Sequence, residues 1–206
     1  MTTNRKINRR EFLFFSAAAA ATAGAAAFLL NIRKLFNATK VLENKAQTIP
    51  QDAKKVFSKC GSCSRTFLTL LNREFGCQKI DEELAADPLA GGLMSTQNQC
   101  GMLWGSALAV GAESFRRYKE QNQALAMAIT GTQYVVESFK KRTKSVNCKE
   151  VVGVDISNKF NVGKFMLKSL PGGFSNMICM NLAEKWAPEA IHSAKEGLSA
   201  KQTDIP

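Results

Sequence analysis

The chain has 206 residues and a mass of 22.5 kDa, a size that suits one domain with an appendage. Apolar residues make up 45% of it and charged residues 22%, which is enough to bury a core, and five prolines and fourteen glycines exclude a collagen-like protein or a linker. Lysine and arginine outnumber aspartate and glutamate by 28 to 17, and this net charge of +11 favours nucleic acid, anionic lipid or acidic protein partners without choosing among them.

The first thirty residues have the features of a targeting segment. Arg9 and Arg10 are followed by Glu11, Phe12 and Leu13, a string that resembles the twin-arginine export signal. An alanine-rich, weakly hydrophobic run follows, as that route requires. Residues 1–30 therefore predict export to the periplasmic side of the cytoplasmic membrane, and an ordinary secretory signal or membrane helix is the alternative.

The same segment leaves open whether the signal is cleaved. Residues 21–23 and 23–25 both form A-x-A cleavage sites. The apolar run nevertheless extends from Phe12 to Leu30, which approaches the length of a bilayer span. The pattern slightly favours a retained anchor helix over a soluble cleaved product, so membrane contact is expected through the N-terminal segment.

Beyond the signal, the pattern predicts an all-α protein, a compact helical bundle preceded by the signal or anchor helix. Residues 31–51 are expected to form a basic amphipathic tether that ends near Pro50. Residues 52–198 form the predicted helical redox domain, and residues 199–206 form a C-terminal tail.

Apolar residues at helical spacing predict helices over 62–76, 102–115 and 121–144, the second entered after a turn at Gly91 and Gly92. The buried face of the third helix is expected to contain Leu125, Ile129, Val136 and Phe139. Shorter helices are predicted over 164–170, 175–186 and 189–198. Residues 151–154 look strand-like but are too few for a sheet.

Six cysteines against one histidine favour thiolate chemistry over imidazole-based zinc or haem sites. Cys60 and Cys63 form a C-x-x-C at a helix start, where the helix dipole lowers a thiol pKa, but this motif alone is a weak signal. The later cysteines are too widely spaced for a zinc finger or a bacterial ferredoxin. A shared site would therefore need one thiolate from each helical segment, and the alternative for any one cysteine is an inert buried residue.

Three local contexts favour a shared site. Cys100 begins a C-G-x-x-x-G segment in which Gly101 and Gly105, one helical turn apart, let a backbone or cofactor approach closely. Cys148 follows a very basic helix end, where a structural thiol has little use. Cys179 is expected in the middle of a helix, between two apolar neighbours.

The order of Cys63, the segment 100–105, Cys148 and Cys179 resembles the C-GCAxxG-C-C family of redox-active proteins, which is related to split-Soret cytochromes c. The resemblance covers roughly residues 59–194, and Met102 stands where the family motif has alanine. It implies that Cys63, Cys100, Cys148 and Cys179 are the four shared thiols. It does not explain Cys60 or Cys77. These two residues flank one short helix and are expected to be dispensable for cofactor binding.

The resemblance implies a redox role, and in split-Soret proteins an iron–sulfur cluster accompanies haem. No C-x-x-C-H for covalent haem is present, and His192 is expected to be a surface or packing residue. Four thiolates satisfy an iron–sulfur centre, with 2Fe–2S favoured over 4Fe–4S. We therefore expect an electron-transfer protein or respiratory-complex subunit rather than a stand-alone enzyme, with no catalytic residue assigned. Its expected partners are other redox proteins such as cytochromes, and a homo-oligomer is compatible with the sequence.

The same residues suggest two alternative functions. The cysteines could instead cycle as dithiols or brace the fold without a metal, and the colour of purified protein separates these hypotheses. A nucleic-acid binder is suggested only by charge, because the basic runs 116–119 and 140–142 lie at predicted helix ends and carry no recognised motif. Solvated faces explain these runs, so no nucleic acid is expected.

Overall fold

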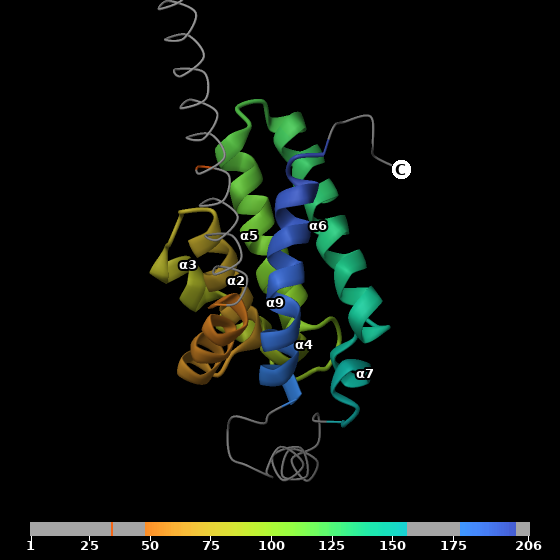
Figure 1. Ribbon diagram of the computed structural model, residues 1–206. Helices are drawn as coiled ribbons and strands as arrows, with labels where there is room; N and C mark the ends of the chain where they lie inside the picture. The colour runs from red at the N-terminus through yellow and green to blue at the C-terminus, as the bar shows by residue number, and fades with distance from the viewer. Residues whose placement is uncertain (1–33, 35–47, 156–177, 201–206) are drawn as a thin grey trace, which may run out of the picture. The chain divides into compact units, whose positions relative to one another are not determined.

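The computed structural model describes residue 34 and residues 48–155 and 178–200. The chain divides into two compact units, residues 1–46 and 47–206, and all described residues except residue 34 belong to the second. Its described residues form helices and no strand, which confirms the all-α class (Figure 1). The predicted signal or anchor, most of the tether, the helix over 164–170 and most of the tail lie outside the described residues. Among the described helices, none combines the length and hydropathy of a membrane span.

The described helices are a helix over 48–60, α2 (Cys63–Glu74), α3 (Ile80–Ala85), the 3-10 turn η1 (Asp87–Leu89), α4 (Ala90–Leu93), α5 (Gly101–Arg117), α6 (Gln121–Thr143), α7 (Cys148–Val152) and α9 (Ile178–Gly197). Short connections join the described helices from residue 48 to α7, and residues 156–177 before α9 lie outside the described residues.

The three helices predicted in the first part of the chain are confirmed as α2, α5 and α6. Ser62 caps α2, since its side chain accepts a hydrogen bond from the backbone N–H of Arg65 at 3.3 Å. Glu120 caps α6 in the same way, by accepting from the N–H groups of Asn122 and Gln123. Lys144, in the left-handed conformation, ends α6.

The core lies where α2, α5, α6 and α9 pack together. Trp186 of α9 is fully buried, with its ring centroid 4.7 Å from that of Phe67 and 4.6 Å from that of Phe139. The Trp186 indole also donates a hydrogen bond to the hydroxyl of Ser138 at 3.1 Å. This buried aromatic cluster therefore fixes α9 against both α2 and α6.

Gly105 sets the distance between α2 and α5. A Cβ atom at Gly105 would lie 1.9 Å from the carbonyl oxygen of Ser64, so no other residue fits there. The sequence predicted a close approach by a backbone or a cofactor at this position, and it is the α2 backbone that approaches.

Proline does not end helices where the sequence predicted. The two helices expected over 175–186 and 189–198 are one helix, α9, with Pro188 inside it. Trp186, Ala187, Ala190 and Ile191 are buried on both sides of that proline, so packing compensates for the missing backbone hydrogen bond. Pro50 likewise lies within helical residues, and the same helix buries Ala53, Val56 and Phe57.

Two further expectations are wrong. Residues 151–154, which looked strand-like, form the end of α7 and its left-handed cap at Gly153, because the segment has no strand partner and Val151 donates to the carbonyl of Asn147. Leu125 and Ile129 are about half exposed, at 50% and 51%. Helix α6 buries a different face, which contains Ala124, Met127, Thr130, Gly131, Val135 and Phe139.

Candidate functional site

Three of the six cysteines lie at the N-terminal ends of helices, and a fourth lies in α9. Cys63 is the first residue of α2, and Cys100 is the N-cap of α5. Cys148 is the first residue of α7, and Cys179 lies in α9, next to residues 156–177, which are outside the described residues. The N-terminal end of a helix carries partial positive charge, so the sulfurs of Cys63, Cys100 and Cys148 occupy positions that favour an anion.

A short antiparallel contact holds Cys100 beside Cys148. The backbone N–H of Cys100 donates to the carbonyl of Val146 at 2.8 Å, and that of Cys148 donates to the carbonyl of Asn98 at 2.6 Å. An isolated β-bridge joins Gln99 to Asn147 between these bonds. The starts of α5 and α7 are therefore fixed side by side, although 48 residues separate their cysteines in sequence.

Gly101 brings Cys63 to the same place. A Cβ atom at Gly101 would lie 2.5 Å from Cys63 Sγ and 2.9 Å from the carbonyl oxygen of Leu89. The missing side chain thus lets the Cys63 thiol approach the first turn of α5, next to Cys100. The predicted close approach at Gly101 is confirmed.

Cys179 completes the group. Cys63 and Cys100 belong to the main core, whereas Cys148 and Val152 form a small separate one, and Cys179 packs against both. Cys63, Cys100 and Cys148 are at most 8% exposed, and Cys179 is partly buried. We call these four residues the four-cysteine site.

Burial raises the pKa of every thiol in this site. Burial raises the pKa of Cys148 to about 11, and negative charge on Cys63 adds to that shift. The pKa of Cys100 lies well above its ordinary value, first because of burial and then because of Cys63, Cys179 and Cys148. Burial, then Cys63 and Cys148, also raise the pKa of Cys179. Since Cys100, Cys148 and Cys179 all respond to charge on Cys63, they lie within electrostatic reach of that sulfur.

Backbone donors partly oppose these shifts. Burial raises the pKa of Cys63 most, and hydrogen bonds from the backbone of Gly91, Ser64 and Cys63 itself lower it. The backbone of Met102 lowers the pKa of Cys100 in the same way. The site therefore disfavours bare thiolates but offers hydrogen-bond donors to thiolates that a cation neutralises.

Sequence reasoning missed the loop that supplies one of these donors. From Gly91 to Gln97 most residues have positive φ, including Leu93 at 70°, Met94 at 47° and Ser95 at 66°. Each non-glycine residue in this conformation costs roughly 1–2 kcal/mol. The loop places Gly91 against Cys63, and Gln97 donates from its side chain to the carbonyl of Val154 at 2.6 Å. The Gly91-Gly92 pair was the available signal, and it predicted only a turn.

The remaining two cysteines are separate from this arrangement. Cys60 and Cys77 are partly buried near opposite ends of α2, and all six cysteines of the chain are free. Cys60 Sγ lies 3.3 Å from Thr66 Oγ1, and its negative charge would raise the pKa of Cys63. Within residues 48–155 and 178–200, no three side chains of His, Cys, Asp or Glu meet closely enough to hold a single metal ion.

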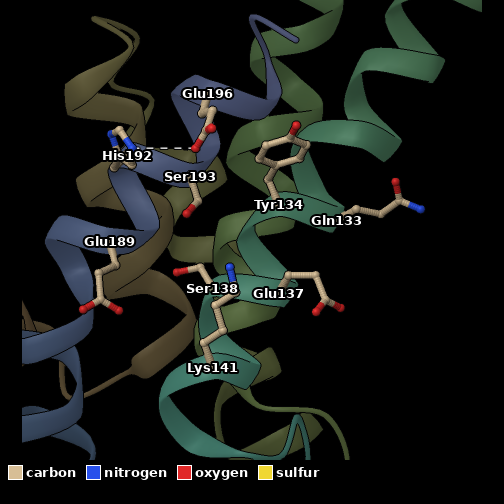
Figure 2. Close-up of a pocket in the computed structure, with 9 residues that line it drawn as sticks. All are labelled: Gln133, Tyr134, Glu137, Ser138, Lys141, Glu189, His192, Ser193 and Glu196. Atoms are coloured by element: carbon tan, nitrogen blue, oxygen red, sulfur yellow. Dashed lines mark ion pairs between the residues drawn. The ribbon is translucent and has the colours of Figure 1, made fainter. Parts of the chain in front are cut away.

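A cavity of about 690 Å³ between α6 and α9 contains the single histidine (Figure 2). The His192 side chain is 79% exposed, with Nε2 3.6 Å from the carboxylate of Glu196. The other two carboxylates on its rim are also paired, Glu189 with Arg142 and Glu137 with Lys140. His192 is thus a surface residue, as expected, and no cysteine lines the cavity.

Comparison with known proteins gives one match. Residues 61–190 match the family described as "Putative redox-active protein (C_GCAxxG_C_C)". All members of the four-cysteine site lie within the matched range, whereas Cys60 lies outside it. No curated protein and no solved structure matches the chain.

Proposed function

Because the chain belongs to the C_GCAxxG_C_C family of redox-active proteins, we propose that it transfers electrons through one iron–sulfur cluster bound by the four-cysteine site. The observation that supports this most is that three buried thiols and one partly buried thiol, from four different helices, lie in one cluster. An iron–sulfur cluster supplies one-electron transfer when it is bound, and four thiolates complete its ligand set.

The chemistry of the donors fits such a cluster. Unneutralised thiolates are costly in this site, because burial and neighbouring sulfurs raise every thiol pKa. Iron would remove that cost, and the backbone donors at Cys63 and Cys100 would stabilise the ligated sulfurs. In a cluster, iron and sulfide stand between the cysteines, so their sulfurs need not meet at one point. The two-iron form is the proposed type.

The sequence supports a location for this function. A twin-arginine signal at Arg9 and Arg10 would export the chain after folding, and hence after a cofactor is inserted in the cytoplasm. We therefore place the redox domain at the periplasmic side of the membrane, where it exchanges electrons with a cytochrome or a subunit of a membrane complex. Replacing both arginines by lysine should leave the protein in the cytoplasm, and unchanged export would exclude this route.

The experiment is iron and acid-labile sulfide analysis of the full chain purified without oxygen, together with its visible absorbance. Serine variants of Cys63, Cys100, Cys148 and Cys179 should each contain less iron than the wild type. The matched control is Cys77→Ser, which should keep full iron because it changes a thiol outside the site. A colourless, iron-free wild type, or full iron in all four variants, would contradict the proposal.

A dithiol function is the second candidate, and the C-x-x-C turn favours it. Cys60 is close enough to Cys63 to raise its pKa, and Gly61 makes the tight turn between them with φ of 67°. Mass spectrometry of the oxidised, iron-free chain would identify a Cys60–Cys63 bridge. Such a bridge in a protein that never contains iron would establish this candidate in place of the cluster.

A further inference from the structure

An apolar groove separates α5 from the segment formed by α3 and η1. Its volume is about 680 Å³, which is in the range of cofactor and small-ligand sites. Trp104 and Leu108 of α5 line it and are 39% and 44% exposed, and Leu68 of α2 and Leu89 of η1 belong to the same apolar lining. Glu82, paired with Lys79 at 2.8 Å, is the one charged residue on its rim.

Small residues of α5 line this groove. They are Ala107, Gly111 and Ala112, and they lie in the same lining as Trp104. A Cβ atom at Gly111 would have nothing within 4 Å, in contrast to Gly101 and Gly105, so no neighbouring helix requires a glycine at this position. The space above Gly111 is open and continues the groove.

The groove adjoins the four-cysteine site. The carbonyl oxygen of Leu89, which lines the groove, and Cys63 Sγ both lie within 3 Å of the same point beside Gly101. The backbone N–H of Trp104 donates to the carbonyl of Cys100 at 3.3 Å. A ligand in the groove would therefore lie along α5 between about one helical turn from Cys100, at Trp104, and about three helical turns from it, at Gly111.

We propose that this groove binds a quinone, with its ring against the Trp104 indole and the alanine and glycine residues of α5. A quinone ring is apolar and can stack on a partly exposed indole beside small side chains, which this lining provides. It also exchanges electrons, as a ligand beside a redox site would. Glu82 can accept a hydrogen bond from the hydroquinone form. On oxidation, the hydroquinone breaks two O–H bonds and releases two protons to water. Its two electrons pass one at a time to the site and on to the partner redox protein, a step that rests on the proposed function.

The binding test uses menadione titrated into the full chain, followed by equilibrium dialysis. Gly111→Leu fills the groove and also replaces glycine by a better helix former. We expect at least tenfold weaker binding in this variant with no loss of thermal stability. The matched control is Gln123→Leu, which adds the same side chain at an exposed position of α6 and should bind as the wild type does.

Three outcomes would overturn the inference: no binding by the wild type, equal binding by Gly111→Leu, or a menadione-insensitive dimer that Gly111→Leu dissociates in sedimentation. The last outcome would mean that a second copy of the chain occupies the groove.

Electron transfer is measured separately, as reduction of the iron-loaded chain by menadiol. Cys179→Ser, checked for folding by circular dichroism, should bind menadione yet accept no electrons. Binding without electron transfer in the iron-loaded wild type would refute the electron step and leave the iron–sulfur proposal to its own test.

Discussion

Gly101 is the position where the four-cysteine site is most tightly packed. Its missing side chain makes room for Cys63 Sγ on one side and the carbonyl oxygen of Leu89 on the other. Gly111, ten residues along the same helix, has open space instead. The two glycines therefore have different roles in one helix, and alanine at each position is expected to change the stability in opposite directions.

Gly101→Ala should lower the free energy of unfolding by about 1–3 kcal/mol, because the new methyl group displaces a sulfur and a backbone carbonyl. Gly111→Ala should raise it by up to about 1 kcal/mol, because alanine is the better helix former and meets nothing there. Urea denaturation of both variants measures the difference. A rise in stability for Gly101→Ala would contradict the close approach of Cys63 to α5, and a fall for Gly111→Ala would contradict the open space beside Gly111.

The raised thiol pKa values make the stability of the iron-free chain depend on pH. The pKa of Cys148 rises from 9.0 to about 11 on folding. Above pH 9 the unfolded chain loses this proton before the folded chain does, so stability falls between pH 9 and 11 and is constant below that range. Cys148→Ser, which has no proton to lose there, should show a smaller fall. Urea denaturation at pH 8, 9, 10 and 11 measures the free energy of unfolding of the two chains. An identical dependence on pH in both would mean that the Cys148 thiol is exposed to solvent.

Helices with regular apolar spacing and capping residues could be predicted from the sequence, and α2, α5 and α6 are the examples. What the sequence could not provide is non-local. The positive φ values from Leu93 to Gln97 depend on contacts with α2 and α7, which are distant in sequence. The face of α6 that carries Leu125 and Ile129 is exposed because small residues on its other side pack against α5.

For the candidate site, too, only the features that depend on local sequence could be predicted. The four cysteines could be selected by their order and the glycines after Cys100, since those features are local. The position of Cys148 at a helix start depends on where α7 begins, which the local sequence did not indicate. The antiparallel contact that joins Cys100 to Cys148 links segments with no local signal for pairing.

Pro188 gives a direct test of whether α9 is continuous. If one helix runs through it, Pro188→Ala restores an N–H group that can bond to the carbonyl of Glu184 and removes a steric conflict. The free energy of unfolding should rise by about 2 kcal/mol after allowing for the greater freedom of the unfolded chain. Thermal and urea denaturation measure this change. A loss of stability would instead indicate two helices with the proline at the start of the second.

The charge of the protein is distributed unevenly along the chain. Residues 48–155 and 178–200 contain 16 basic and 14 acidic residues, so they account for only +2 of the net +11. The excess lies in residues 1–47 and 156–177, which contain 11 basic and two acidic residues. The net charge of residues 48–155 and 178–200 therefore does not call for an anionic partner. Attraction to anionic surfaces is expected from residues 1–47 and 156–177 instead.

The four-cysteine site connects parts of the chain that are far apart in sequence, so a bound cluster would restrain the whole helical domain. Its cysteines follow one another after 37, 48 and 31 residues, and they belong to α2, α5, α7 and α9. Ligation at all four would close three long loops of the unfolded chain, which in a disulfide of similar span contributes about 2–5 kcal/mol. At roughly 2–4 °C for each kcal/mol, anaerobic removal of iron by a chelator should lower the melting temperature by about 10 °C. Calorimetry of loaded and stripped protein measures this shift. Cys77→Ser should respond to the chelator as the wild type does, and an unchanged melting temperature after full loss of iron would mean that the cluster does not link these helices.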